Sequence, residues 1–289
     1  MKTSTRILAT LACGMGLMVA AARADTPPTE PQLEAFEADA FAQLMVAAQA
    51  EPLMQIVATE GARHGLGLEA SLFPGRGGAA WRQVVSTIQA PDRLVPLLAK
   101  ALRSELAPED AAAAARFLND GAGARVVERE IVARRQMLDS DVEAEARQAS
   151  AAAFENGTAR AELIGEMIQA LDLVTVNVSG GLNANYAFYR GLGDGGALKS
   201  RLTESEMIAM VWAQETQVRR SIRGWLQGYL SLAYAPLSDD ELRDYLAFTK
   251  TAPGRRYMSA MFQGFGSVFE TTSYELGLAA AKFIAQQDA

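Results

Sequence analysis

The chain has 289 residues, of which 49% are hydrophobic, and it carries 27 basic against 34 acidic residues. This length is sufficient for a sizeable core, and a net charge of −7 without a basic patch argues against nucleic acid as a partner. A single cysteine and a single histidine exclude a disulfide framework and a multi-histidine metal site.

The N-terminus has the pattern of a secretory signal peptide. Lys2 and Arg6 precede an apolar segment over residues 7–22, and Ala22 and Ala24 frame an A-x-A cleavage site. We therefore expect residues 1–24 to be removed by cleavage after Ala24, which places the mature protein in the periplasm or outside the cell.

A lipoprotein signal is the alternative for the same segment. Leu11, Ala12 and Gly14 surround Cys13 in the manner of a lipoprotein cleavage box, although the apolar stretch before Cys13 is short. No later stretch is apolar enough to predict a membrane span, so the sequence predicts no transmembrane helix once the signal is removed.

The rest of the first half is predicted to be helical with one glycine-rich loop. Apolar residues recur at helical spacing over residues 32–50, 53–63 and 79–89, and Pro91 opens a further helix. Six glycines between Gly61 and Gly78 predict a loop there.

A long helical pattern follows, over residues 124–154. Val127, Ile131, Arg134 and Leu138 recur in it at helical spacing.

The second half repeats this order. A helix is predicted over residues 161–178, followed by a glycine-rich interruption over 180–196. Thr203 and Glu206 form a capping-box pattern that opens a long helix through Trp225, and a final helix reaches about Ile284.

Two stretches align without a gap and predict an internal duplication. One starts at Leu106 and the other at Leu237, and the alignment pairs Phe117 with Phe248, Gly123 with Gly254, and upstream Trp81 with Trp212. We therefore expect a duplicated helical bundle, with the first repeat over residues 25–155, the second over 156–289, and each tryptophan close to the phenylalanine of its own half.

The later stretch predicts two helices joined by a tight corner. Ser238 and Glu241 have the S-x-x-E spacing of a capping box at a helix start, and Pro253 with Gly254 suits a bend between helices. Phe248 lies on the inward side of the first helix, so its ring is expected to be buried.

This pattern resembles the bacterial family known as domain of unknown function 2059. The resemblance rests on an L-[ST]-x-x-E-L helix followed by F-x-x-[ST]-x-x-G, here from Leu237 to Gly254, with Pro253 one position later than in the family. The resemblance implies an all-helical exported bacterial protein, present here as two diverged copies, and it transfers no catalytic residue because the family has no established activity.

His64 and one glycine motif have explanations that involve no catalytic or binding role. His64 is interpreted as a surface loop residue rather than a general base, because no partners for it are apparent. Gly191, Gly193 and Gly196 match G-x-G-x-x-G, but no strand precedes them, so the match is interpreted as coincidence.

Charged residues at the repeated corners have similar explanations. The run from Asp239 to Glu241 suits the first turn of a helix better than a cation site. Arg125 and Arg256 are interpreted as partners of acids such as Asp110 or Glu241 rather than as an anion site.

The aromatic residues of the second half are the one feature that could mark a binding site. They could line an apolar groove, for which the candidates are Trp212, Trp225, Tyr229, Phe248 and Tyr257. The same spacing is typical of a helical core, so the sequence leaves groove and core open.

No catalytic, cofactor-binding or metal-ligating residue is assigned from the sequence. The leading hypothesis is a non-enzymatic envelope protein that binds a partner protein or an apolar molecule. The alternative is a carboxylate-based hydrolase acting on cell-envelope material, because paired acids are compatible with the sequence.

Overall fold

The computed structural model describes residues 30–198 and 203–285, and within these ranges it contains helices and no strand. The first seven helices are α1 Glu30–Ala47, α2 Ala50–Leu72, α3 Gly78–Ile88, α4 Pro91–Glu105, α5 Pro108–Leu118, α6 Gly121–Gln136 and α7 Ser140–Glu155. The others are α8 Ala159–Ala170, α9 Leu173–Asp194, α10 Glu204–Trp212, α11 Glu215–Tyr234, α12 Asp239–Thr249 and α13 Ala252–Ala285. The all-helical prediction is confirmed, whereas the signal peptide predicted over residues 1–24 lies outside the described residues.

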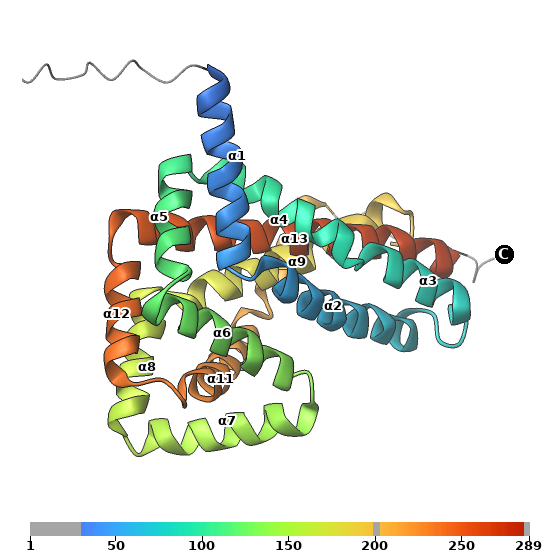
Figure 1. Cartoon of the computed structure of the whole chain (residues 1–289). Helices are drawn as coiled ribbons and strands as arrows, with labels where there is room; N and C mark the ends of the chain where they lie inside the picture. Colours follow the sequence, from blue (N-terminus) through green and yellow to red (C-terminus); the bar gives the residue numbers. More distant parts are fainter. Residues whose placement is uncertain (1–29, 199–202, 286–289) are drawn as a thin grey trace, which may run out of the picture.

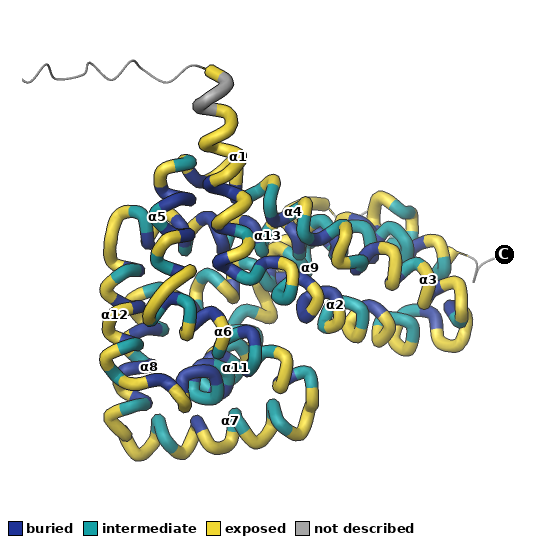
Figure 2. The backbone as a smooth tube through the Cα atoms, in the orientation of Figure 1, coloured by how far each residue is buried: buried dark blue, intermediate teal, exposed yellow. Residues whose placement is uncertain are grey.

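Helix α13 is the long axis of the molecule (Figure 1). It makes its most extensive contact with α9, and it also packs against α2, α3, α4 and α5. At one end, α5 and α12 lie beside the start of α13, and α6, α8 and α11 lie below it, with α7 along the lower edge. Helices α2 and α3 accompany the C-terminal part of α13 (Figure 1). The first half of α1 stands away from the body, and its residues 34–39 are exposed (Figures 1 and 2).

The largest core draws on both predicted halves of the chain. It joins buried residues of α1, α2, α4, α5 and α6 to others of α8, α11, α12 and α13 (Figure 2). A second cluster lies at the other end, where the ring of Trp81 meets Phe73 and Phe283 edge-on, with centroids 5.0 and 5.3 Å away. The indole N–H of Trp81 donates to the carbonyl oxygen of Gly65 at 3.0 Å.

Both predicted glycine-rich loops are wrong over most of their length, because helices continue to Leu72 and to Asp194; only residues 73–77 and 195–196 of these stretches are non-helical. Helix α2 passes through Gly61 and Gly65, and α9 passes through Gly191. A Cβ atom at Gly65 would lie 3.0 Å from Val85, and one at Gly191 would collide with the backbone of Tyr274 on α13. At these two positions, glycine permits close helix packing, which outweighs its poor intrinsic helix propensity.

Three predicted helices are divided in the structure. The 124–154 segment is interrupted between α6 and α7, where the carboxylate of Asp139 caps α7 by accepting from the N–H of Asp141 at 2.9 Å. The 161–178 segment is interrupted at Asp172, which adopts a left-handed conformation with φ 48°. The helix opened by the capping box of Thr203 ends at Trp212, and α11 begins at Glu215.

The two helix–corner–helix units correspond closely. Helices α5 and α12 begin and end at positions that the ungapped alignment pairs, and so do the starts of α6 and α13. Phe117 and Phe248 stack on each other, with ring centroids 3.9 Å apart and planes 9° apart. Phe248 is only partly buried, contrary to the expectation that its ring would be buried. Its ring stacks on that of Phe117, the paired residue of the other unit.

Two ion pairs also link the two helix–corner–helix units to each other. Arg256 holds Asp110 through two hydrogen bonds of 2.5 and 2.7 Å, and Arg125 lies 2.9 Å from Glu241. The alignment pairs Arg125 with Arg256 and Asp110 with Glu241, so each unit supplies the arginine for the other's acid. The interpretation of both arginines as salt-bridge partners is confirmed.

The wider duplication of the two halves is not confirmed. Trp81 packs in the cluster around Phe73 rather than against Phe117, and Trp212 is 59% exposed on α10 rather than beside Phe248. The equivalence that the structure contains is limited to the corners, because the helices upstream of them have different bounds and different neighbours.

Candidate functional site

Aromatic faces of two helices meet beside a charged face of a third. Trp225 and Tyr229 lie one turn apart on α11, while Phe262, Phe265 and Phe269 follow the same face of α13 at helical spacing. Together with Glu130 of α6, they line a cavity of about 190 Å³, which we call the aromatic cavity.

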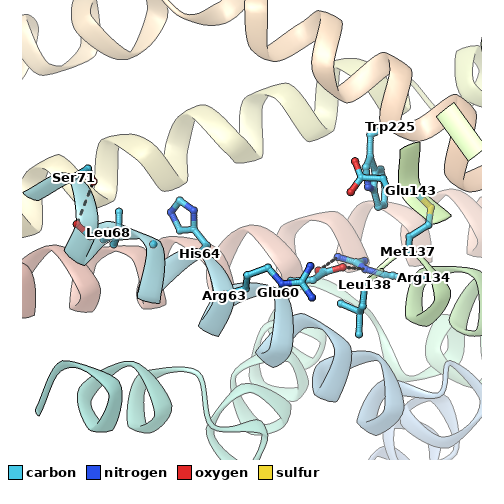
Figure 3. Close-up of a pocket in the computed structure, with 11 residues that line it drawn as sticks. Glu60, Arg63, His64, Leu68, Ser71, Arg134, Met137, Leu138, Glu143 and Trp225 are labelled. Atoms are coloured by element: carbon cyan, nitrogen blue, oxygen red, sulfur yellow. Dashed lines mark hydrogen bonds and ion pairs between the residues drawn. The ribbon is translucent and has the colours of Figure 1, made fainter. Parts of the chain in front are cut away.

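Two further spaces adjoin the aromatic cavity. An inner cavity of about 140 Å³ shares Glu130 and Tyr229 with it and reaches Tyr257 and Met261. An open groove of about 680 Å³, the vestibule, is lined on one side by α2 and on the other by α6, α7 and Trp225 (Figure 3). All three spaces share Arg134 as a lining residue.

Arg134 is fixed where the three spaces meet. Its Nε and Nη2 donate to the two carboxylate oxygens of Glu60 at 3.1 and 2.8 Å (Figure 3). The guanidinium carbon lies 5.8 Å from the ring centroid of Trp225 and 6.0 Å from that of Phe265, within range of a cation–π attraction. Burial acts to lower the pKa of Arg134, but the charge and hydrogen bonds of Glu60 outweigh it and raise the pKa, so the guanidinium stays charged.

Glu130 is the second charged residue of the aromatic cavity. Its Oε1 accepts from the hydroxyl of Tyr234 at 2.6 Å, and its main-chain oxygen accepts from the hydroxyl of Tyr229 at 3.2 Å. Burial raises the pKa of Glu130 to about 7, although the Tyr234 hydrogen bond and the charge of Arg134 each lower it. This carboxyl group therefore changes its charge near neutral pH.

The tyrosines around Glu130 remain neutral hydrogen-bond donors. Burial, and after it the negative charge of Glu130, raises the pKa of Tyr229, Tyr234 and Tyr245 well above the usual value. The cavity thus combines aromatic rings, neutral hydroxyls and two charged side chains.

Comparison of the chain with family models, with curated proteins and with solved structures found no match. The resemblance to domain of unknown function 2059 therefore stays a prediction.

The candidate groove residues do not all come together. Trp225 and Tyr229 line the aromatic cavity, and Tyr257 lines the inner cavity. Trp212 is exposed on α10, and Phe248 stacks on Phe117 at the corner; neither lines one of these spaces.

The corner residues singled out from the sequence have structural roles. The Ser238 hydroxyl accepts from the N–H of Glu241 at 3.3 Å, and the Glu241 carboxylate accepts from the N–H of Ser238 at 2.8 Å, which confirms the capping box. A Cβ atom at Gly123 or Gly254 would collide with the carbonyl of the phenylalanine that precedes it in its own unit. These glycines allow the tight corner.

His64 lies on helix α2, not in the loop predicted for it. Its side chain is exposed at the vestibule, one turn from Glu60 (Figure 3). The G-x-G-x-x-G match falls at the end of helix α9, where Gly191 is buried against α13, and the residues directly before it are helical rather than a strand.

No helix in the described part of the chain has both the length and the hydropathy to cross a membrane. Within residues 30–198 and 203–285, no cluster of three or more acidic, histidine or cysteine side chains could hold a metal ion. Asp239, in the acidic run considered as a cation site, instead lies 3.1 Å from Arg160.

The sequence patterns do not single out Glu130, and they do not identify Arg134 as a site residue. The available signal was a charged residue within an otherwise apolar stripe: Arg134 shares the helical spacing of Val127 and Ile131. A charged residue on the inward face of a helix indicates a buried ion pair or a binding site. Helical spacing does not identify the partner of Arg134, because Glu60 lies on another helix.

Proposed function

We propose that this protein is a non-enzymatic binding protein that holds a small ring-bearing apolar molecule in the aromatic cavity. The observation that carries the proposal is the convergence of Trp225, Tyr229, Phe262 and Phe265 around a partly enclosed space with few polar groups. An apolar cavity of about 150 Å³ is enough to bind benzene, so this space is large enough for a single aromatic ring.

The way in which Glu60 and Glu130 are paired favours binding over the hydrolase alternative. Glycoside hydrolysis needs two carboxyl groups free to act on either side of the bond that breaks. Glu130 is the one acid among the described residues that line the aromatic cavity, and Glu60 of the adjoining vestibule has both carboxylate oxygens held by Arg134. Glu130, whose pKa is raised, is one carboxyl group where such a reaction needs two.

The test of binding is isothermal titration calorimetry of the full chain with indole, a neutral aromatic probe. Met258 lines both the aromatic and the inner cavity and is partly buried, so Met258→Trp should fill them and abolish the heat of binding. Leu171→Trp, at the α8–α9 junction, is a second way to fill the aromatic cavity.

The matched control is Met207→Trp on α10, a partly buried methionine that lines none of the described cavities. It should leave indole binding unchanged. Equal binding to wild type and to both cavity-filling variants would place the ligand elsewhere and refute the proposal.

Export to the periplasm is part of the same proposal. It is supported by the positive start, the apolar segment and the A-x-A site that ends at Ala24. The intact mass of the protein recovered from the cell envelope should correspond to a chain that begins at Asp25. A mass that corresponds to an acylated N-terminal Cys13 would instead establish a membrane-anchored lipoprotein.

A further inference from the structure

Glu130, the acid that lines the aromatic cavity, has no salt-bridge partner among the described residues. Arg134 is its one cationic lining residue among those described, and its guanidinium is committed to both oxygens of Glu60. Glu130 accepts one side-chain hydrogen bond, from the neutral hydroxyl of Tyr234. When Glu130 is ionised, its negative charge therefore lacks a salt-bridge partner in the described part of the chain, since Arg134 is paired with Glu60 of the adjoining vestibule.

The rings beside Glu130 offer faces to a cation. Trp225 and Tyr229 are stacked, with centroids 4.9 Å apart and planes 20° apart, and both line the aromatic cavity. Aromatic faces attract cations, most strongly where water is excluded. The Arg134 guanidinium near Trp225 and Phe265 is already an example within this site.

An anionic ligand fits the same cavity poorly. A carboxylate would have to share Arg134 with Glu60, which already holds its Nε and Nη2, and it would then lie close to Glu130. Like charges at short distance in a poorly solvated site repel strongly. A neutral ligand would leave the excess charge of Glu130 without a counterion.

Building on the proposed function, we infer that the natural ligand of the aromatic cavity is a ring-bearing organic amine. Its ammonium group pairs with the carboxylate of Glu130, and its apolar ring packs against Trp225 and Tyr229. Arg134 remains bound to Glu60 and separates the cavity from the vestibule.

Protonation of Glu130 gives this inference a second observable. Burial raises the pKa of Glu130 to about 7, and an ammonium ion next to it would lower that pKa, so amine binding below pH 7 should release a proton. The other titratable or charged groups around this carboxyl come from five helices: Glu60, Arg134, Tyr229, Tyr234, Tyr245 and Tyr257. The pKa values of the tyrosines and of Arg134 are all raised, so the tyrosines stay neutral and the guanidinium stays charged in this range, and Glu130 is the group expected to release the proton.

The experiment compares three probes that share one ring: benzylamine, benzyl alcohol and benzoate. Each is titrated into the full chain by calorimetry at pH 8. We expect benzylamine to bind about tenfold or more tightly than benzyl alcohol, and benzoate to bind most weakly. At pH 6, the heat of benzylamine binding should differ between buffers of different ionisation enthalpy by an amount that corresponds to proton release.

Glu130→Gln should remove the advantage of the amine, so that benzylamine and benzyl alcohol bind alike and proton release disappears. The control is Glu128→Gln, exposed on the same helix, which should leave all three affinities unchanged. If Glu130→Gln does not fold, the three wild-type affinities and the proton release decide the inference by themselves.

The outcomes separate this inference from the proposed function. If benzyl alcohol binds and Met258→Trp abolishes that binding, but benzylamine binds no more tightly, the amine inference is wrong and the proposed function stands. Tightest binding by benzoate would also overturn the amine inference. If indole and all three probes fail to bind, both proposals fail together.

Discussion

Glu130 is a carboxyl group surrounded largely by aromatic side chains. The hydroxyl of Tyr234 and the charge of Arg134 favour its ionised form, but they do not compensate fully for the loss of water, and its pKa stays near 7. A glutamate in an unfolded chain has a pKa near 4.3, so folding raises the proton affinity of this residue.

The pH dependence of stability should therefore carry a contribution from Glu130. Because its pKa is higher in the folded state, the stabilising contribution is complete below about pH 4.5 and is lost as the pH rises through about 7. Glu130→Gln resembles the protonated carboxyl, so its free energy of unfolding should improve relative to wild type by about 2 kcal/mol from pH 5 to pH 8. Urea unfolding at the two pH values measures this difference.

Glu128→Gln is the matched control for this change, because Glu128 is exposed on the same helix. Its difference from wild type should stay nearly constant with pH. A constant difference for Glu130→Gln as well would mean that the Glu130 carboxyl is solvated in the folded protein.

At the scale of the element, α13 contains two glycines with opposite roles. Gly254 lies at the corner, where a Cβ atom would collide with the carbonyl oxygen of Phe248. Gly266 lies farther along the same helix, with no atom within 4 Å of the place a Cβ would occupy. One glycine is needed for close approach, while the other only weakens the helix.

The same substitution at the two positions should therefore have opposite effects. Gly254→Ala should lower the free energy of unfolding by about 1–3 kcal/mol, because the corner must open to admit the methyl group. Gly266→Ala should raise it by about 0.5–1 kcal/mol through the better helix propensity of alanine. Urea unfolding measures both; stabilisation by Gly254→Ala would contradict the tight corner.

The whole molecule is joined by contacts between its two predicted halves. Helix α13 packs against α2, α3, α4 and α5, and the largest core contains buried residues from both sides of Asn156. The crosswise pairs of Arg125 with Glu241 and of Arg256 with Asp110 also cross this point. A fragment from either side would expose much of its apolar surface to water.

Division of the chain after Asn156 should consequently abolish independent folding. Fragments 25–156 and 157–289 should each lack a cooperative urea transition by circular dichroism, and mixing them should restore one. Cooperative unfolding of either fragment alone would support the two-repeat division at residue 156 as a boundary between independent domains.

The sequence alone determined the features that depend on neighbouring residues. Helical spacing predicted an all-helical chain, and the capping box of Ser238 with Glu241 placed the start of α12 correctly. Cap hydrogen bonds and helix periodicity act within a few residues, so they can be read before the fold is known.

Only the tertiary structure decided the continuity of the glycine-rich helices and the composition of the site. Gly191 lies in a helix because α13 packs closely against it, and Tyr234 reaches Glu130 from 104 residues away in sequence. Arg134 fits the apolar stripe of α6 because Glu60 of another helix compensates its charge. Such contacts form between distant segments whose packing no local pattern specifies, whereas helix caps and helical spacing act within one segment.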